Sequence, residues 1–499
     1  CAYDKRHNRF LGLVCFFSAE NIAMQRISKL YLSLANRTVA SSLAEMPDCR
    51  GLPVIGTISS LVQSDRGKRL HEYIDKMHRR HGPMFRGRIG PTKAIFVSST
   101  DAIREVFRLE GPTPQHFVPE AWLLYNKLKD RERGLLFMDG QEWLHYRRIL
   151  NKMMLAPDSA KSMSKPCQEA AMDLVEKWKG YRNNERIVPD LENQLYQWSI
   201  EVLLATLVGS AWPSYRRSIL NELGILSCSL SRIFEYSVHL SSVPARLAML
   251  LRMPSWTGFV TAADYSLDTV GRFVEEMEKL ENAEDGLLGA MLRNGIDSEM
   301  LKRICVDLIL AAGDTTAYSM QWLLYLMASN PSAQEAARQS LLELDEAEVL
   351  RNAFLKGAIK ESLRLYPTAP FLTRILPQDT LLAGYPACKG ELVVVSLYSC
   401  GRDEANFPRA DEFLPQRWLR SEKGEFQGVI NPNATLPFAM GARSCIGRKL
   451  AEVQMSLTMA ELLRNFKIDC VNKNKVRMKL RMISAPSEPL QLQLTPWSR

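Results

Sequence analysis

The sequence has no closely spaced cysteines. Its ten cysteines are scattered from position 1 to position 470, and no two of them form a C-x-x-C pair. The spacing indicates neither a zinc site nor a disulfide framework, and it fits a reducing compartment.

Long basic runs and stripes of basic and aromatic residues are also absent. The chain carries a net charge of +9, but without such runs we expect no nucleic-acid partner. An acidic protein or a membrane surface is a better partner for this surplus of positive charge, and ordinary solvated surface residues account for much of the charge.

The sequence further lacks internal repeats, a strong linker and a G-x-G-x-x-G dinucleotide loop. Its 499 residues, 46% of them apolar and 24% charged, suit a globular protein that can enclose a cofactor. We expect one folded domain over residues 47–499. The basic, acid-poor residues 1–46 are interpreted as a mitochondrial targeting leader or a disordered tail, because the apolar run 10–17 is too short to cross a bilayer.

The hydrophobic pattern predicts a mainly α, α+β fold. Helical spacing covers residues 71–81, alternation over 83–97 predicts a β-hairpin, and most of 101–365 is helical. Residues 304–312 are apolar except for Asp307, which is typical of a buried central helix.

The chain does contain a cysteine on a loop rich in glycine. Residues 436–452 read LPFAMGARSCIGRKLAE, and helical spacing follows. Cys445 therefore lies just before a helix N-terminus, where free N–H groups and the helix dipole favour thiolate over thiol. A soft thiolate near the flat ring of Phe438 suits an iron porphyrin, and a buried, inert cysteine in a glycine turn is the alternative.

This loop resembles the haem-binding loop of the cytochrome P450 family, with the pattern F-x-x-G-x-R-x-C-x-G starting at Phe438. The resemblance implies a helical haem-binding domain with a small β-rich lobe, and haem b as the cofactor. It implies that Cys445 is the axial ligand of the iron and that Arg443 meets a haem propionate. By the same resemblance, further propionate contacts come from Trp143 and Arg147, which match W-x-x-x-R, and from Arg374.

A second motif, AAGDTT at residues 311–316, falls on the expected central helix. The family pattern there is A-G-x-[D/E]-T-[T/S], but this chain has Ala312 at the usual glycine position and Gly313 one place later. A Thr315 hydroxyl that bonds to a carbonyl one turn earlier would bend the helix. We assign proton delivery to Asp314 and Thr315, with a helix N-cap as the alternative.

Glu361 and Arg364 lie one helical turn apart, so an ion pair is expected. The family's E-x-x-R motif implies a buried, structural triad that Arg417 completes, and Gln416 replaces the usual glutamate beside it. The resemblance also implies two cavity-lining segments, with the residues Phe371, Leu372, Thr373, Ile483 and Ser484. Residues 230–262 are amphipathic, and either roof that cavity and dip into a membrane surface or pack as ordinary core.

Oxygen activation at a haem requires two electrons, and the absence of a dinucleotide loop implies that a separate protein supplies them. Four cations could form a basic docking patch, with generic solubility as the alternative: Lys356, Lys360, Arg448 and Lys449. The spacing of the two lysines resembles that of mitochondrial family members. That resemblance implies an acidic [2Fe–2S] ferredoxin with its NADPH-dependent reductase.

Segments outside the shared motifs, among them 70–75, 142–151 and 195–203, resemble the insect members of this family that hydroxylate ecdysteroids at C2. The resemblance implies a steroid substrate, 2-deoxyecdysone converted to ecdysone. It also implies a mitochondrial enzyme attached peripherally to the matrix side of the inner membrane. A hydroxylase of other regiochemistry, a haem–thiolate isomerase or dehydratase, and a non-catalytic haem or sterol carrier stay open.

Overall fold

The computed structural model describes residues 45–49, 62–89, 92–181, 187–241, 243–281 and 283–497. The leader expected over residues 1–46 lies almost entirely outside the described residues.

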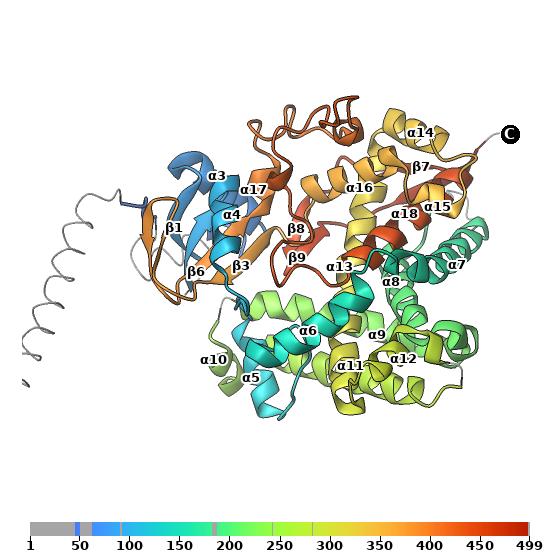
Figure 1. Cartoon of the computed structure of the whole chain (residues 1–499), viewed down its shortest axis with the longest axis horizontal. Coiled ribbons are helices and arrows are strands. Elements are labelled where there is room, and N and C mark those ends of the chain that lie inside the picture. Colours follow the sequence, from blue (N-terminus) through green and yellow to red (C-terminus); the bar gives the residue numbers. More distant parts are fainter. Residues whose placement is uncertain are drawn as a thin grey trace, which may run out of the picture.

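A four-stranded mixed sheet with the order β1-β2-β6-β3 occupies one end of the molecule (Figure 1). β1 (Met84–Ile89) and β2 (Thr92–Val97) are antiparallel, which confirms the expected hairpin. β2 runs parallel to β6 (Leu392–Ser396), and β6 pairs antiparallel with β3 (Phe371–Ile375). The sheet therefore joins the early hairpin to strands from late in the chain.

Alternate residues of the sheet enter two separate cores, as the two-residue period of a strand requires. Phe96 and Val394 pack with Ile74 of α3 (Leu70–His81). The opposite face packs against α4 (Thr100–Leu109). Both faces are covered, so the small β lobe has its own hydrophobic interior.

Helices form most of the remaining molecule. Two of them, α8 (Leu191–Val208) and α13 (Ser298–Ser329), lie against each other and are mostly buried. The others are α5 (Glu120–Leu128), α6 (Gly140–Met154), α7 (Ser159–Lys179), α9 (Trp212–Leu240), α10 (Ala245–Leu250), α11 (Pro254–Met277), α12 (Leu287–Arg293), α14 (Pro331–Gln339), α15 (Glu346–Val349), α16 (Ala353–Leu365), α17 (Leu397–Gly401) and α18 (Arg448–Asn465).

Three small antiparallel pairs complete the strands. They are β4 (Thr380–Leu382) with β5 (Tyr385–Ala387), β7 (Phe466–Cys470) with β10 (Leu492–Pro496), and β8 (Met478–Arg481) with β9 (Ile483–Pro486).

The central helix α13 is confirmed, and it extends well beyond the apolar run that predicted it. It begins after Asp297, whose side chain accepts a hydrogen bond from the N–H of Met300 at 2.9 Å. Asp307, the one charged residue in the apolar run, is buried and lies 2.6 Å from Nη2 of Arg133. A buried carboxylate is tolerated here because a cation neutralises it.

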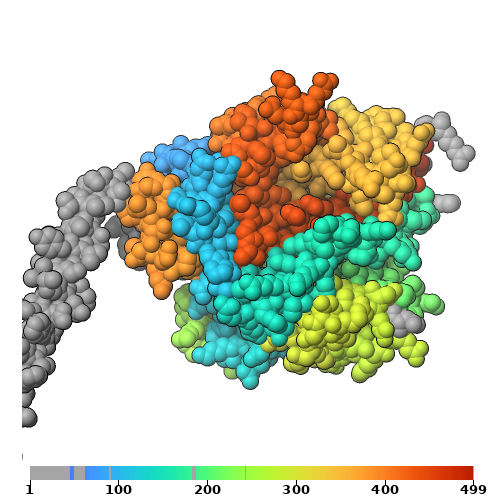
Figure 2. Space-filling model, in the orientation of Figure 1, coloured from blue at the N-terminus to red at the C-terminus, as the bar shows by residue number. Residues whose placement is uncertain are grey.

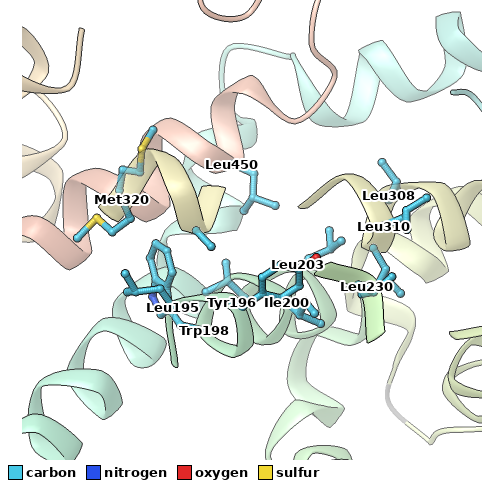
Figure 3. Close-up of a cluster of buried hydrophobic side chains, with 14 of the residues drawn as sticks. Leu195, Tyr196, Trp198, Ile200, Leu203, Leu230, Leu308, Leu310, Met320 and Leu450 are labelled. Carbon is cyan, nitrogen blue, oxygen red and sulfur yellow. The ribbon is translucent and has the colours of Figure 1, made fainter. Parts of the chain in front are cut away.

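The main hydrophobic core lies between the long helices. Figure 3 shows residues of α8 such as Leu195 and Leu203 gathered with Leu308 and Met320 of α13 and with Leu450 of α18. Among the residues that the structure describes, no helix combines the length and the apolarity that a bilayer crossing requires.

Candidate active site

The cysteine loop, defined as residues 436–447, leads directly into α18. Within it the N–H of Cys445 donates to the carbonyl of Phe438 at 2.8 Å, and the N–H of Ser444 donates to the carbonyl of Gly441 at 3.2 Å. α18 starts one residue after Gly447, its N-cap. The loop therefore holds the thiol just before a helix N-terminus, as the sequence predicted.

Cys445 faces a space inside the molecule. The residue has exposed surface, yet burial is the largest influence on the thiol and raises its pKa. The two observations agree if surrounding protein encloses the space that the thiol faces. The Gly447 N–H and Arg147 lower the pKa, but burial outweighs them. The loop N–H thus acts on the thiol in the expected direction, toward the thiolate, while burial opposes it.

The middle of α13 is open as well. Ala311 and Thr315, one turn apart, have exposed surface on a helix that is otherwise largely buried. The Thr315 hydroxyl donates to the carbonyl of Ala311 at 2.8 Å, which is the bond to the preceding turn that the sequence predicted. A core helix exposes two such residues only to an internal space, so this turn borders a hollow.

Asp314 points into a different environment from Thr315. It is 2% exposed, and burial raises the pKa of its carboxyl to about 8. The negative charge of Glu192 raises this pKa further, whereas Tyr196, as a hydrogen-bond donor, and Arg481 lower it. The carboxyl is therefore mostly protonated at neutral pH.

The displaced glycine of the central helix has a packing explanation. A Cβ atom at position 313 would lie 2.5 Å from Cε1 of Tyr196, which belongs to α8. Gly313 therefore lets the tyrosine ring lie against the backbone of α13, next to Asp314. Tyr196 was not recognised from the sequence, and the shifted glycine was the only signal of it.

Two of the three arginines expected to bind carboxylates act on His116, and the third acts on one of these two. Arg443 and Arg374 add to burial in lowering the pKa of His116 to about 4. Burial, with Arg374 and Arg147, likewise lowers the pKa of Arg443 to about 10. Buried nitrogens of the cluster, Nε of Arg147, Nη2 of Arg374 and Nδ1 of His116, have no hydrogen-bond partner among the described residues. Repelling cations with unpaired donors form a site for an anion. His116 stands in no motif and was missed.

Helix α6 clamps the cysteine loop with the two residues that the W-x-x-x-R spacing singled out. The guanidinium of Arg443 lies 4.3 Å from the centre of the Trp143 ring. Arg147 donates to the carbonyl of Ser444. Asp139, just before the helix, accepts from Nη2 of Arg443 at 2.6 Å. Arg443 is thus held by the protein itself, in addition to any ligand.

The structure also joins the three residues of the expected structural triad. Glu361 accepts from Nη2 of Arg364 at 2.7 Å and from Nε of Arg417 at 2.8 Å. Trp418 and the backbone N–H of Leu414 donate to the same carboxylate at 2.8 and 3.1 Å. The carboxylate and both guanidiniums are almost fully buried. The triad ties α16 to the segment that precedes the cysteine loop.

The residues expected to line the substrate cavity do not all reach one. Phe371, Leu372 and Thr373 of β3 and Ile483 of β9 are half-buried. Ser484 is wrong as a lining residue, because it is 0% exposed. Successive residues of a strand point to opposite faces, so Ile483 and Ser484 cannot line the same surface.

The cytochrome P450 family model matches residues 46–494. The chain belongs to the cytochrome P450 family. Cytochrome P450 315a1, mitochondrial, of Drosophila melanogaster is 37% identical over 92% of this chain and 90% of the relative. The mitochondrial 1,25-dihydroxyvitamin D(3) 24-hydroxylase of Rattus norvegicus is 27% identical over 91% of this chain and 90% of that enzyme. The mitochondrial cholesterol side-chain cleavage enzyme of Hypanus americanus is 29% identical over 84% of this chain and 83% of that enzyme.

As a P450 of the mitochondrial type, the protein is a haem–thiolate monooxygenase, with the mainly helical fold and small β lobe that the sequence predicted. Its site residues fit haem b. Cys445 has exposed surface just before the N-terminus of α18, where its sulfur could hold the iron. Arg147 and Arg374 have unpaired buried donors that could meet the propionates, and Arg443 adds positive charge beside them.

The four cations expected at the docking surface of this P450 line one surface hollow of about 550 Å³. Figure 2 shows the face on which it opens, between the yellow, orange and red surfaces. Lys356, Lys360 and Arg448 are exposed. Lys449 differs, because its ammonium donates to the carbonyls of Ala156 and Pro157. Three cations are therefore free to meet a partner, and the fourth fixes α18 to the end of α6.

Residues 230–262, the amphipathic stretch of this P450, contain both ordinary core residues and residues with exposed apolar side chains. Leu240 and Trp256 are buried, so core packing is correct for them. Leu247, Leu250 and Leu251 on and beside α10 are 44%, 77% and 63% exposed. These three leucines form an apolar surface at the edge of the helical region.

Proposed function

We propose that this P450 hydroxylates a steroid, and that the reaction is the insertion of one oxygen atom at C2 of 2-deoxyecdysone to give ecdysone. The observation that carries the proposal is the resemblance of segments outside the shared motifs to insect C2-hydroxylases, among them 70–75, 142–151 and 195–203. The 37% identity to a Drosophila P450 over 92% of the chain supports it. Two other relatives are named for cholesterol and a dihydroxyvitamin D, which supports the coarser assignment to steroids and sterols.

Haem, when bound, supplies the oxygen chemistry: one oxygen atom enters a substrate C–H bond and the other leaves as water, with two electrons and two protons consumed. Cys445 would hold the iron. Arg147 and Arg374 would hold the propionates through the donors that lack partners, and Arg443 would add its positive charge. These contacts fix the orientation of the cofactor in the chain.

Asp314 and Thr315 would deliver the protons that the reaction consumes. A carboxyl with a pKa of about 8 holds a proton at pH 7 and can release it without a large energetic cost. The Thr315 hydroxyl borders the internal space and can pass that proton on. The apolar residues around them keep bulk water away from the reacting groups.

The electron donor in this proposal is an acidic [2Fe–2S] ferredoxin, reduced by its NADPH-dependent reductase. Lys356, Lys360 and Arg448 form a cationic surface that suits such a partner. The proposed location is the matrix side of the mitochondrial inner membrane, with the leucines beside α10 in peripheral contact with lipid. Residues 1–46 would serve as the targeting leader and residues 47–499 as the catalytic domain.

The test is turnover of the purified chain with ferredoxin, reductase and NADPH. A panel of deoxyecdysteroids, cholesterol and a dihydroxyvitamin D is offered separately, and the products are mapped by mass spectrometry and NMR. We expect 2-deoxyecdysone to gain one oxygen atom at C2. A product oxidised at another carbon, or turnover of the other sterols alone, contradicts the assignment. Cys445→Ala is the control, since it should abolish both turnover and the red-shifted Soret band of the reduced CO complex.

A further inference from the structure

Tyr196 of α8 packs closely against the backbone of α13. Its ring rests against Gly313, because a Cβ atom there would lie within 2.9 Å of the tyrosine hydroxyl oxygen. Figure 3 shows Tyr196 among the buried side chains of α8 that pack toward α13. The contact brings a phenol beside the turn that carries Asp314.

Two polar atoms at this contact lack partners. The Tyr196 hydroxyl and Oδ2 of Asp314 are both buried, and neither has a hydrogen-bond partner of good geometry among the described residues. Each residue is 2% exposed. Each also affects the other: the phenol acts as a donor that lowers the pKa of Asp314, and the carboxylate raises the pKa of Tyr196. The two groups therefore face each other, and a small rotation of either side chain completes the pair.

A second polar cluster connects this pair toward solvent. Glu192 lies one turn before Tyr196 on α8 and accepts from the hydroxyl of Tyr318 at 2.7 Å and from Nη1 of Arg481 at 2.9 Å. Arg481 also lies 3.1 Å from the Tyr318 hydroxyl. The side chains of Glu192 and Arg481 are 31% and 27% exposed. Polar groups thus extend from a partly exposed ion pair to the buried carboxyl of Asp314.

We propose that Tyr196 is a positioning residue for Asp314, and that protons reach Asp314 from the Glu192–Tyr318–Arg481 cluster. The proposal rests on the proposed role of Asp314 in proton delivery. For each proton that Asp314 gives toward Thr315, the Tyr196 hydroxyl donates one proton to the carboxylate and accepts another from the Tyr318 hydroxyl, which regains one from solvent by way of Glu192. Solvent replaces that proton, and no electron moves.

The groups that face Asp314 act in opposite directions, which makes the proposal testable. Tyr196 of α8 and Arg481 of β8 lower the pKa of Asp314, whereas Glu192 of α8 raises it. Tyr318 of α13 lies within the same cluster. Tyr196→Phe removes a donor to the carboxylate and should raise the pKa, and Glu192→Gln removes a negative charge and should lower it.

The measurement is the infrared C=O band of the protonated Asp314 carboxyl, titrated from pH 6 to 10 in the resting holoenzyme without substrate. Asp314→Asn identifies the band. We expect its midpoint, about 8 in the native enzyme, to rise in Tyr196→Phe and to fall in Glu192→Gln. Tyr325→Phe is the matched control. Tyr325 lies on α13, the helix of Asp314, but its hydroxyl donates to the carbonyl of Lys473, so its loss should leave the band in place.

A second readout is the yield of product per NADPH, which should fall about 10-fold in Tyr196→Phe, because the carboxyl loses the hydroxyl that positions and reprotonates it. An unmoved band in Tyr196→Phe means that the ring only packs against Gly313, and it overturns the proposal. An unmoved band in Glu192→Gln overturns the route of entry, even if Tyr196→Phe fails to fold. Because the band requires no substrate, a failure of the steroid assignment leaves this result intact.

Discussion

A side chain at position 441 would collide with Glu110, because the Cβ atom of any residue other than glycine would overlap Oε1 of that carboxylate. Gly441 also has a φ of +79°, which favours glycine. The carboxylate accepts from the N–H of Ala442 at 2.7 Å and from Nε of Arg374 at 2.5 Å. Gly441 thus makes room for Glu110, which links the cysteine loop to an arginine of the anion site.

Glu110→Gln should therefore weaken both the fold and the cofactor site. The change leaves the charge of Arg374 unbalanced in a buried place, and loss of one member of a buried ion pair costs about 3–5 kcal/mol. The two donors bond different oxygens of the carboxylate, and in glutamine one of these becomes an NH2 group, which cannot accept. We expect a lower thermal midpoint and faster loss of haem to a haem-scavenging protein.

Asp101→Asn is the matched control for that experiment. Asp101 lies on α4, which ends just before Glu110, and its side chain is 90% exposed and paired with Arg104 at 3.3 Å. An exposed pair of this kind contributes about 0–1 kcal/mol. Equal haem loss from the two variants would show that Glu110 does not organise the site.

The sequence predicted those parts of the site whose residues lie close together in the chain. The cysteine loop, the Trp143–Arg147 pair and the Asp314–Thr315 pair are local patterns, and their spacing alone indicates a shared loop or helix face. Glu110, His116 and Tyr196 were missed because each of them acts on residues far along the chain. Which residues they meet depends on how the helices pack, and a single sequence does not contain that information in any local pattern.

The corrected residues show the same limit. Lys449 lies beside Arg448, yet the rotation between successive helical residues directs it to the carbonyls of Ala156 and Pro157 instead of solvent. Ser484 follows Ile483 but points to the opposite face of its strand. Burial, which is a tertiary property, also acts on Cys445, where it opposes the effect of the local N–H groups on the pKa of the thiol.

Asp314→Asn should change how stability depends on pH. Burial raises the folded-state pKa from its ordinary value of 3.8 to about 8, so the fold is favoured at low pH and this stabilisation is lost as the pH rises from about 4 to 8. The loss is about 1.4 kcal/mol per pH unit between the two values, because the unfolded state has then released a proton that the folded state retains. We expect the thermal midpoint of Asp314→Asn, relative to the native protein, to increase from pH 5 to pH 8 and to level off above.

The matched control for this pH series is Asp268→Asn, since the side chain of Asp268 is 66% exposed. Its pH profile should follow that of the native protein. A difference between Asp314→Asn and the native protein that stays constant from pH 5 to pH 9 would mean that Asp314 is already ionised throughout this range.

Thr315→Ala should separate oxygen consumption from hydroxylation. The change removes the hydroxyl that borders the internal space beside Asp314. Substrate binding, followed by the spectral shift of the haem, should be retained, while product per NADPH falls about 10-fold because a proton donor is missing. Thr315→Ser keeps the hydroxyl and should restore most of the yield. Unchanged coupling in Thr315→Ala would remove the residue from the proton route.

Charge reversal at the docking surface should weaken ferredoxin binding without harming the haem site. Lys356 and Lys360 are exposed on α16, and Nζ of Lys360 lies 5.5 Å from the centre of the Trp418 ring. Lys356→Glu places a negative charge against an acidic partner, so we expect the KM for ferredoxin to rise at least about 10-fold at low salt. The kcat at saturating ferredoxin and the Soret band should change little, because neither reports on the encounter.

Salt provides the decisive comparison for this surface. Between charges that attract each other, raising the ionic strength weakens association, so the native KM should rise with salt while that of Lys356→Glu rises less. Lys389 is also exposed and lies just after β5. Lys389→Glu should therefore show the same KM for ferredoxin and the same salt dependence as the native protein. Lys449→Glu should instead lower stability, because the ammonium of Lys449 is bound to backbone carbonyls and is not free for a partner. A KM that is insensitive both to salt and to Lys356→Glu would place the ferredoxin on another face of the molecule.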